Sequence, residues 1–201
     1  MSIHLLPLLS YVLISTFTPG PSNLSTTSLA VLHGYKKTIQ YQGGLAVGVF
    51  LLMVLSGLVS ATLLRFFPIL EPVLRYMGAA YILYLAFGIL KASYIFVDEA
   101  DENVKPVGFG HGLLLQILNP KLVVYAFTLF SGFLLPITNS GALIVLAAAL
   151  LAATSFVATS VWALFGNAMK RYLHNPRLKT VVNLLLSLSL VYTAIALTGL
   201  L

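Results

Sequence analysis

Long stretches of apolar residues, each about the length of a membrane span, make up most of the chain. An α-helix needs ~20 residues to cross the hydrocarbon core of a bilayer, and six stretches come close to that length or exceed it. They cover about 4–32, 43–64, 73–97, 108–135, 141–167 and 178–201. The pattern therefore predicts an all-α polytopic membrane protein of six transmembrane helices, with residues 1–201 forming a single membrane domain.

Two of these stretches are interrupted by proline, the first at Pro19-Gly20-Pro21 and the fourth at Asn119-Pro120-Lys121. A proline inside a helix removes a backbone donor and clashes with the preceding turn. At membrane depth the freed backbone groups are tolerated only where they are buried in protein or line a wet cavity. We therefore predict that the first and fourth helices are broken at proline, and that the two breaks face each other and form a substrate site.

One polar segment divides the chain into two halves. Residues 98–107 contain four of the five acidic residues and read as an exposed loop between 1–97 and 108–201. Each half then has three spans, and because three is odd, the halves must be inverted in the membrane if they are structural repeats. Gly/Pro-interrupted segments at corresponding positions of two repeats indicate a transport site near the bilayer midplane.

The distribution of Lys and Arg predicts the orientation. With six spans, Arg65 and Arg75 fall on one side of the membrane and Lys121 lies within a span. The remaining eight basic residues fall on the opposite side: Lys36, Lys37, Lys91, Lys105, Lys170, Arg171, Arg177 and Lys179. The positive-inside bias places these eight in the cytoplasm and both termini outside it. The first stretch lacks the basic region and cleavage site of a secretory signal, so we expect it to remain in the mature protein.

The motifs at the two breaks resemble those of a known family. Residues 18–23 read Thr-Pro-Gly-Pro-Ser-Asn and are followed by His33-Gly34 and by Gly43-Gly44 leading into Gly48. Together with 78–85 (Gly-Ala-Ala-Tyr-Ile-Leu-Tyr-Leu) and 116–121 (Gln-Ile-Leu-Asn-Pro-Lys), they resemble, in order and over the whole chain, the LysE/RhtB family of amino-acid exporters. The sequence departs from the family at Ser22, where Asn or Asp is more usual. The resemblance implies export of small amino acids or their derivatives from a bacterial cytoplasm across the inner membrane, in exchange for protons.

The residues at the breaks also suit an amino-acid substrate on physical grounds. Unwinding at proline presents carbonyl groups on one side and the N–H groups of the following half-helix on the other. A helix N-terminus is partially positive and favours an anionic group such as an α-carboxylate. A packing kink with back-bonded hydroxyls is the structural alternative. The candidate substrate-binding residues are Pro19, Gly20, Pro21, Ser22, Asn23, Thr27, Gln116, Asn119, Pro120 and Lys121.

Lys121 is the one basic residue deep inside a predicted span. A lysine near the bilayer centre costs about 2.5–3.5 kcal/mol on insertion scales, so it should face a cavity or a partner unless it snorkels to the membrane boundary. We expect it to anchor a carboxylate or to carry a proton. No Asp or Glu lies within a predicted span, which leaves Lys121, His111 or the substrate itself as the candidates for proton coupling.

Small residues four positions apart predict close helix packing. Gly44 and Gly48 form one such pair, and Gly108 and Gly112 form another. Pairs of this kind allow helix backbones to approach closely. They suit contacts within one protomer or at the interface of a homodimer, and the pattern leaves both open.

Composition narrows the function classes. The chain has no cysteine, which removes thiol chemistry and Cys metal sites, and its four histidines are scattered. The net charge of +6 is spread over short loops, so we expect no nucleic-acid partner. We predict no cofactor, no metal site and no enzymatic activity, with an amino-acid substrate and the lipid bilayer as the partners. An exporter of another solute, such as a basic amino acid or a metal ion, and an intramembrane enzyme are the alternatives.

Overall fold

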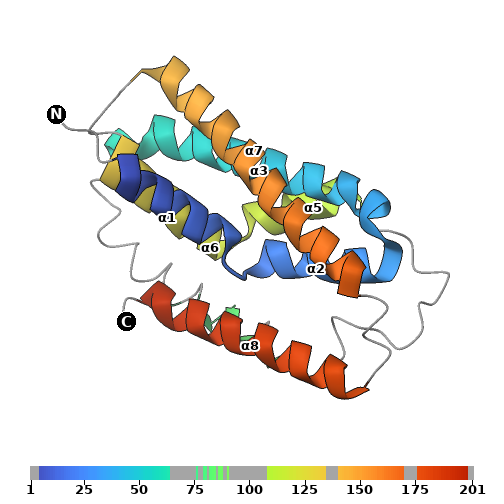
Figure 1. The fold of residues 1–201 in the computed structure, drawn as a ribbon. Coiled ribbons are helices and arrows are strands. Elements are labelled where there is room, and N and C mark those ends of the chain that lie inside the picture. Colours follow the sequence, from blue (N-terminus) through green and yellow to red (C-terminus); the bar gives the residue numbers. More distant parts are fainter. Residues whose placement is uncertain are drawn as a thin grey trace.

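The computed structural model describes residues 5–63, 108–134, 140–169 and 176–198, together with 76, 79, 80, 82–84, 86, 87 and 90. Helices account for nearly all of these residues, and the described part of the chain contains no strand. The helices, in chain order, are α1 (Leu5–Phe17), α2 (Pro21–His33), α3 (Tyr35–Leu63), α5 (Phe109–Ile117), α6 (Pro120–Leu129), the π-helix η1 (Phe130–Leu134), α7 (Gly141–Met169) and α8 (Pro176–Thr198). Figure 1 shows that α1 begins and α8 ends at the same end of the molecule, opposite the turn between α2 and α3.

Length and hydropathy make α3 and α7 candidates for crossing a membrane. Their mean hydropathies are 1.7 over Tyr35–Leu58 and 2.3 over Gly141–Met169, and α5 and α6 meet the same criterion as one span bent by 62°. Along α7, Leu146, Leu150 and Val157 are each more than half exposed. Apolar side chains exposed in this way suit contact with lipid, and with the apolar composition of the chain they define an integral membrane protein of α-helices.

The described helices follow the predicted apolar stretches, and the first and fourth stretches are each divided at a proline, into α1 and α2 and into α5 and α6. One boundary differs: α3 begins at Tyr35, ahead of the predicted span at Gly43. Lysine is a good helix former, so Lys36 and Lys37 continue α3 with exposed side chains instead of ending it. The predicted loop at 98–107 lies outside the described residues, as does most of the third stretch.

Two apolar clusters build the core on either side of the helix breaks. One joins α2 and the segment around Ile82 to α8, and the other joins α3 and α6 to α7, with Tyr11 of α1 packed against it. The first contains Leu24, Val31, Ala79, Ile82, Ala86, Leu190 and Ala194; the second contains Val49, Met53, Leu122, Tyr125, Ala126, Leu129, Phe130, Ile144, Ala148, Leu151 and Ala152. Because α1 packs with one cluster and α2 with the other, the break between them lies where the two clusters meet.

Glycine contacts bring the backbone of α5 against that of α3. A Cβ atom on Gly44 would lie 2.0 Å from the carbonyl oxygen of Phe109, and one on Gly112 would lie 2.1 Å from that of Tyr41. Gly48 gives room in the same way to the side chain of Gln116, which a Cβ would approach to 2.8 Å. By contrast, no atom of the described residues lies within 4 Å of a Cβ built on Gly108, so the packing role of that glycine stays a prediction. The close approach of α3 and α5 fixes Gln116 beside the helix breaks.

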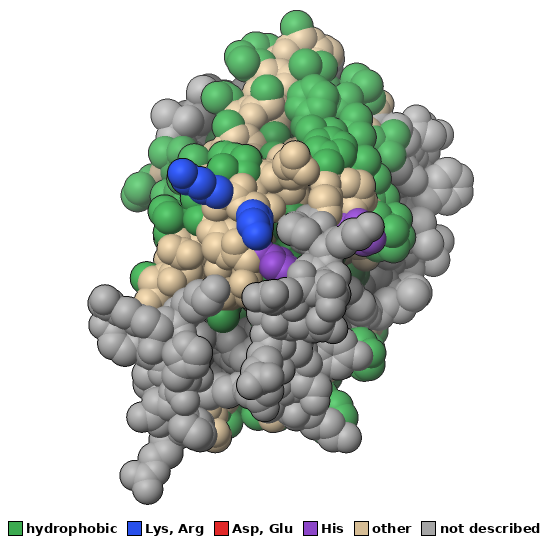
Figure 2. Space-filling view, turned by 90° about the vertical axis from the view of Figure 1, so that its right-hand side faces the viewer, with side chains coloured by type: hydrophobic (Ala, Val, Ile, Leu, Met, Phe, Trp, Pro, Cys, Tyr) green, Lys and Arg blue, Asp and Glu red, His purple; other side chains and the backbone are tan. Residues whose placement is uncertain are grey.

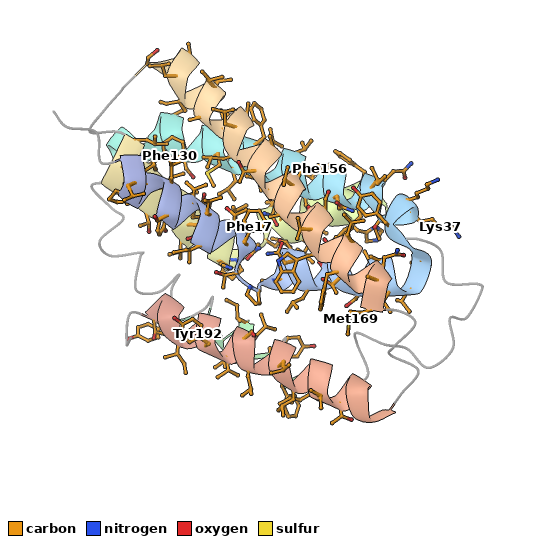
Figure 3. All side chains as sticks on the ribbon, viewed as in Figure 1. Phe17, Lys37, Phe130, Phe156, Met169 and Tyr192 are labelled. Carbon is orange, nitrogen blue, oxygen red and sulfur yellow. The ribbon has the colours of Figure 1, made fainter. Side chains whose placement is uncertain are left out.

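Hydrogen bonds join α2, α3 and α7 near the turn between α2 and α3. The Tyr41 hydroxyl donates to Ser25 Oγ at 2.8 Å, and Ser160 Oγ donates to Gln42 Oε1 at 2.9 Å. Figure 2 shows Lys and His side chains gathered on the face at this end, and Figure 3 shows Lys37 extending outwards there. In the same view Phe17, the last residue of α1, lies about midway along the molecule between Lys37 and Phe130. The break after Phe17 is therefore central to the length of the helical body.

Candidate functional site

The two proline breaks contact each other directly. Ser22 Oγ, at the start of α2, donates a hydrogen bond to Gln116 Oε1 at the end of α5. Asn119 Nδ2 donates to Ser22 Oγ at 3.1 Å, and Lys121 Nζ lies 3.3 Å from the carbonyl oxygens of Thr18 and Pro19. Segments about one hundred residues apart in the chain thus meet through polar groups.

Proline sets the start of a helix at both breaks. Pro21 and Pro120 stand at the first positions of α2 and α6, where the missing N–H would have no helical partner and the fixed φ suits the helix. The residue before a proline is pushed out of the helical region, and Gly20 and Asn119 are accordingly extended. The breaks therefore separate two pairs of short helices and leave backbone carbonyl and N–H groups at the junctions.

A small cavity with polar groups in its lining lies at the junctions. Its volume is about 60 Å³, and side chains of α1, α2, α3, α5, α6 and α7 contribute to it. The lining residues are Ser15, Thr16, Thr18, Gly20, Pro21, Ser22, Asn23, Val49, Gln116, Asn119, Lys121, Leu122, Tyr125, Leu151 and Ser155. Most of these residues carry hydrogen-bonding side chains, although the protein around them is strongly apolar.

Asn23 holds the end of α1 against the start of α2. Its side-chain amide nitrogen donates to the carbonyl oxygens of Thr16 at 2.9 Å and Thr18 at 3.0 Å. These carbonyls belong to the last turn of α1 and to the break, where they lack the full set of helical partners. Asn23, 6% exposed, is therefore a structural partner of the break as well as a lining residue.

The half-buried Lys121 is stabilised by the negative end of a helix. The described residues include no Asp or Glu, and the partners given for Lys121 Nζ are the carbonyl oxygens of Thr18 and Pro19. The C-terminus of a helix carries a partial negative charge, so the end of α1 suits a cation. Gly20 makes room for this arrangement, because a Cβ atom there would lie 3.2 Å from Lys121 Nζ and Cδ.

The starts of α2 and α6 differ in their capping. The Asn119 side-chain oxygen accepts from the backbone N–H of Lys121 at 3.1 Å and so caps α6. At α2 the capping position is Gly20, and no side chain in the described part of the chain caps the helix. The first N–H groups of α2, those of Ser22 and Asn23, therefore stand at an uncapped helix start beside the cavity. Such a terminus attracts anionic groups.

Some predicted site residues lie elsewhere. Thr27 is buried between α2 and α7, where its hydroxyl donates to the carbonyl oxygens of Asn23 at 2.8 Å and Trp162 at 3.2 Å, and it does not line the cavity. His111 is exposed on α5 and does not line the cavity either. Pro19 contributes its carbonyl oxygen to Lys121, and Pro120 contributes the start of α6. The other predicted binding residues surround the cavity.

Four lining residues stand out that the sequence reasoning missed. The sequence does not show which carbonyl groups at the end of a helix lack helical partners. Thr16 and Thr18 could therefore not be identified from it. Tyr125 follows Lys121 by four residues and so shares its face of α6, a signal that could have identified it. Ser155 lies in the middle of an unbroken apolar helix, α7, where nothing local distinguishes it.

The described contacts bear on two chemical alternatives. A serine nucleophile needs a neighbouring base, but the Ser22 hydroxyl donates to an amide oxygen while Lys121 is held by carbonyls. Among the residues that the structure describes, no group of three or more His, Cys, Asp or Glu is placed to hold a metal ion. What the cavity offers is hydrogen-bond donors, acceptors and one cation, which is the chemistry of a binding site.

A polar cavity between broken helices of an integral membrane protein defines a membrane transport protein. The chain belongs to the family of LysE type translocators, whose model matches residues 13–199. Among its curated relatives are three proteins named cysteine/O-acetylserine efflux protein. That of Salmonella typhimurium is 35% identical over 189 residues, covering 92% of this chain and 93% of the relative. That of Klebsiella pneumoniae is 34% identical over 163 residues (81% and 82%), and that of Escherichia coli K12 is 32% identical over 186 residues (92% and 93%). No solved structure matches the chain.

Proposed function

We propose that the chain is a secondary transporter that exports small neutral amino acids or their derivatives across the bacterial inner membrane in exchange for protons. The observation that carries the proposal is the cavity where Ser22, Gln116, Asn119 and Lys121 meet at two broken helices. The names of the relatives, which state cysteine and O-acetylserine as substrates, support the same class of substrate.

The two charged groups of an amino acid have complementary partners in the cavity. The carboxylate would bind between Lys121 Nζ and the uncapped N–H groups of α2, because both are positive. The ammonium group would bind the carbonyl oxygens at the end of α1, including that of Thr18, which now accept from Lys121. Binding thus exchanges the lysine–carbonyl contacts for contacts of both groups with the zwitterion.

Cavity size and charge favour a small neutral substrate. A volume of about 60 Å³ compares with ~10–15 Å³ for one water, so the space suits a handful of non-hydrogen atoms. No Asp or Glu is present among the lining residues to receive a cationic side chain. The proposal therefore places serine-sized solutes ahead of lysine or arginine.

Two inverted three-helix repeats with six spans would place this cavity near the midplane. In support, α2 and α6 both begin with proline, and each broken pair is followed by a helix of 29 residues, α3 or α7. We place the end with Lys36 and Lys37 in the cytoplasm and both chain termini in the periplasm, in line with the common end of α1 and α8 in Figure 1. Lys121 is the proposed site of proton coupling, since it lines the cavity and His111 does not.

Transport by the purified protein in proteoliposomes tests the proposal. Labelled cysteine, O-acetylserine, homoserine, threonine and lysine would be offered with and without an imposed pH gradient. We expect gradient-dependent flux of the small neutral members, a loss of tenfold or more in Lys121→Ala, and unchanged flux in Lys37→Ala, an exposed lysine outside the cavity. Absence of flux across the panel would overturn the proposal. Flux that ignores the gradient would overturn proton coupling alone.

A further inference from the structure

One residue of the cavity lining carries a buried polar group that has no hydrogen-bond partner among the residues that the structure describes. The hydroxyl of Tyr125 is buried among the described residues, and no donor or acceptor meets hydrogen-bond geometry with it. The side chain of Thr16 approaches it without forming a hydrogen bond. Unpaired buried polar groups are rare in native proteins, and each one calls for a reason.

Several other polar side chains of the cavity lining do have partners among the described residues. Ser22 bonds to Gln116 and Asn119, Asn23 makes two hydrogen bonds, and Lys121 makes two. Phenylalanine at position 125 would keep the apolar contacts without burying an unpaired hydroxyl. The hydroxyl therefore costs stability in the empty cavity, and a partner that arrives with the substrate would offset that cost.

Aromatic packing fixes the direction of the Tyr125 side chain. Its ring centroid lies 5.5 Å from that of Tyr11, whose ring in turn stacks on Phe133 at 5.5 Å. The residue as a whole is only 9% exposed. Held by these neighbours, the side chain stays in the cavity lining, and its hydroxyl cannot turn outwards to bond with bulk water.

We propose that Tyr125 determines specificity by hydrogen-bonding the polar, uncharged side chain of the substrate: a hydroxyl, a thiol or an ester group. The inference rests on the proposed amino-acid transport. Lys121 and Tyr125 are four residues apart on one face of α6, which places their Cβ atoms about 5–6 Å apart. An amino acid whose carboxylate is held at Lys121 therefore extends its side chain along this face towards the Tyr125 hydroxyl.

This arrangement selects against substrates of the same shape that lack the polar group. A site built around a hydrogen bond rejects such analogues, because the buried polar group of the protein is then left unpaired. Serine should accordingly be preferred to alanine, and cysteine to 2-aminobutyrate. A substrate with an apolar side chain would leave the Tyr125 hydroxyl without a hydrogen-bond partner, as it is in the empty cavity.

Transport selectivity of Tyr125→Phe in proteoliposomes tests the inference. The ratio of serine to alanine transport efficiency is measured for the wild type, for Tyr125→Phe and for Tyr192→Phe, a matched change at an exposed tyrosine of α8. Loss of one hydrogen bond should lower the ratio by about 3- to 10-fold in Tyr125→Phe, through slower serine transport with alanine transport retained. The ratio should stay at the wild-type value in Tyr192→Phe.

The outcomes separate this inference from the proposed function. A wild type that transports neither amino acid overturns both, whereas wild-type transport with an unchanged ratio in Tyr125→Phe overturns the specificity role alone. A lower melting temperature with an unchanged ratio would show that Tyr125 pairs with a protein group such as Thr16. Thermal stabilisation of the wild type needs no variant: serine should raise the melting temperature more than alanine at equal concentration, and equal shifts would contradict the inference.

Discussion

The side-chain amide of Asn119 donates to the hydroxyl oxygen of Ser22 at 3.1 Å, across a separation of 97 residues in the chain. The same hydroxyl donates to Gln116, so one serine joins the start of α2 to both sides of the break between α5 and α6. Ser22 replaces the Asn or Asp more usual in the resembled motif, and here it is fully engaged. One hydroxyl group thus pairs with both sides of this break.

Replacing Ser22 by alanine should destabilise the protein. The change leaves the amides of Gln116 and Asn119, each 4% exposed, without this partner, and an unsatisfied buried polar group costs about 1–3 kcal/mol. We expect a fall of several degrees in the melting temperature in detergent and weaker transport, with partial recovery in Ser22→Thr. Ser28→Ala is the matched control, because the Ser28 hydroxyl bonds within its own helix to Leu24. Equal melting temperatures for the two alanine variants would contradict this role of Ser22.

A methyl group at position 20 should displace Lys121 without unfolding the protein. In Gly20→Ala the added Cβ would meet Lys121 Nζ and Cδ at 3.2 Å, and the far end of a lysine can move away. The extended backbone of Gly20 accepts alanine without strain. We expect a nearly unchanged melting temperature and a rise in the apparent KM of about tenfold, the equivalent of ~1.4 kcal/mol. Gly110→Ala serves as the control, since no described atom lies within 4 Å of its added Cβ. An unchanged KM in Gly20→Ala would argue against Lys121 as the carboxylate anchor.

Alanine at Gly44 should separate α3 from α5 and disrupt the fold. A Cβ atom 2.0 Å from the carbonyl oxygen of Phe109 cannot be accommodated by side-chain movement, so one backbone must shift. Overpacking typically costs about 1–3 kcal/mol and sometimes more. Yield of monodisperse protein and melting temperature should both fall sharply, whereas Gly141→Ala, open at the start of α7, should match the wild type. Normal behaviour of Gly44→Ala would mean that the two helices are farther apart than described.

The single tryptophan should report on substrate binding. Trp162 Nε1 donates to the carbonyl oxygen of Phe17 at 3.1 Å, at the end of α1 and next to the carbonyl groups proposed to bind the ammonium group. Substrate that alters the end of α1 should change the intensity or wavelength of tryptophan emission, saturating with concentration. The response should be lost in Lys121→Ala. A change of equal size in that variant would show that the signal does not come from the proposed site.

Local sequence chemistry located most of the cavity. A proline beside polar residues marks the point at which a helix begins again. This pattern identified Ser22, Asn23, Asn119 and Lys121 as candidate site residues. Thr27 shares a helix face with Asn23 but lies outside the cavity lining, because one turn later that face contacts α7. The packing of α1 and α7 brings Ser155 and the carbonyl groups of Thr16 and Thr18 to the cavity. The periodicity of an apolar membrane helix does not indicate which helix it packs against. For Gly44 and Gly112, the small-residue pattern in the sequence indicated a close helix contact but not which helix would be the partner.

The unequal caps of α2 and α6 have a stereochemical consequence. Two broken helices that started alike would offer an amino acid two equivalent ways to lie between them. Because Asn119 caps the start of α6 and no side chain of the described residues caps the start of α2, the carboxylate has one destination and the ammonium group, at the end of α1, another. The two remaining substituents on the α-carbon then cannot exchange places without moving the side chain away from Tyr125. The site should therefore distinguish the two enantiomers of the substrate, and the L and D forms should cross the membrane at different rates.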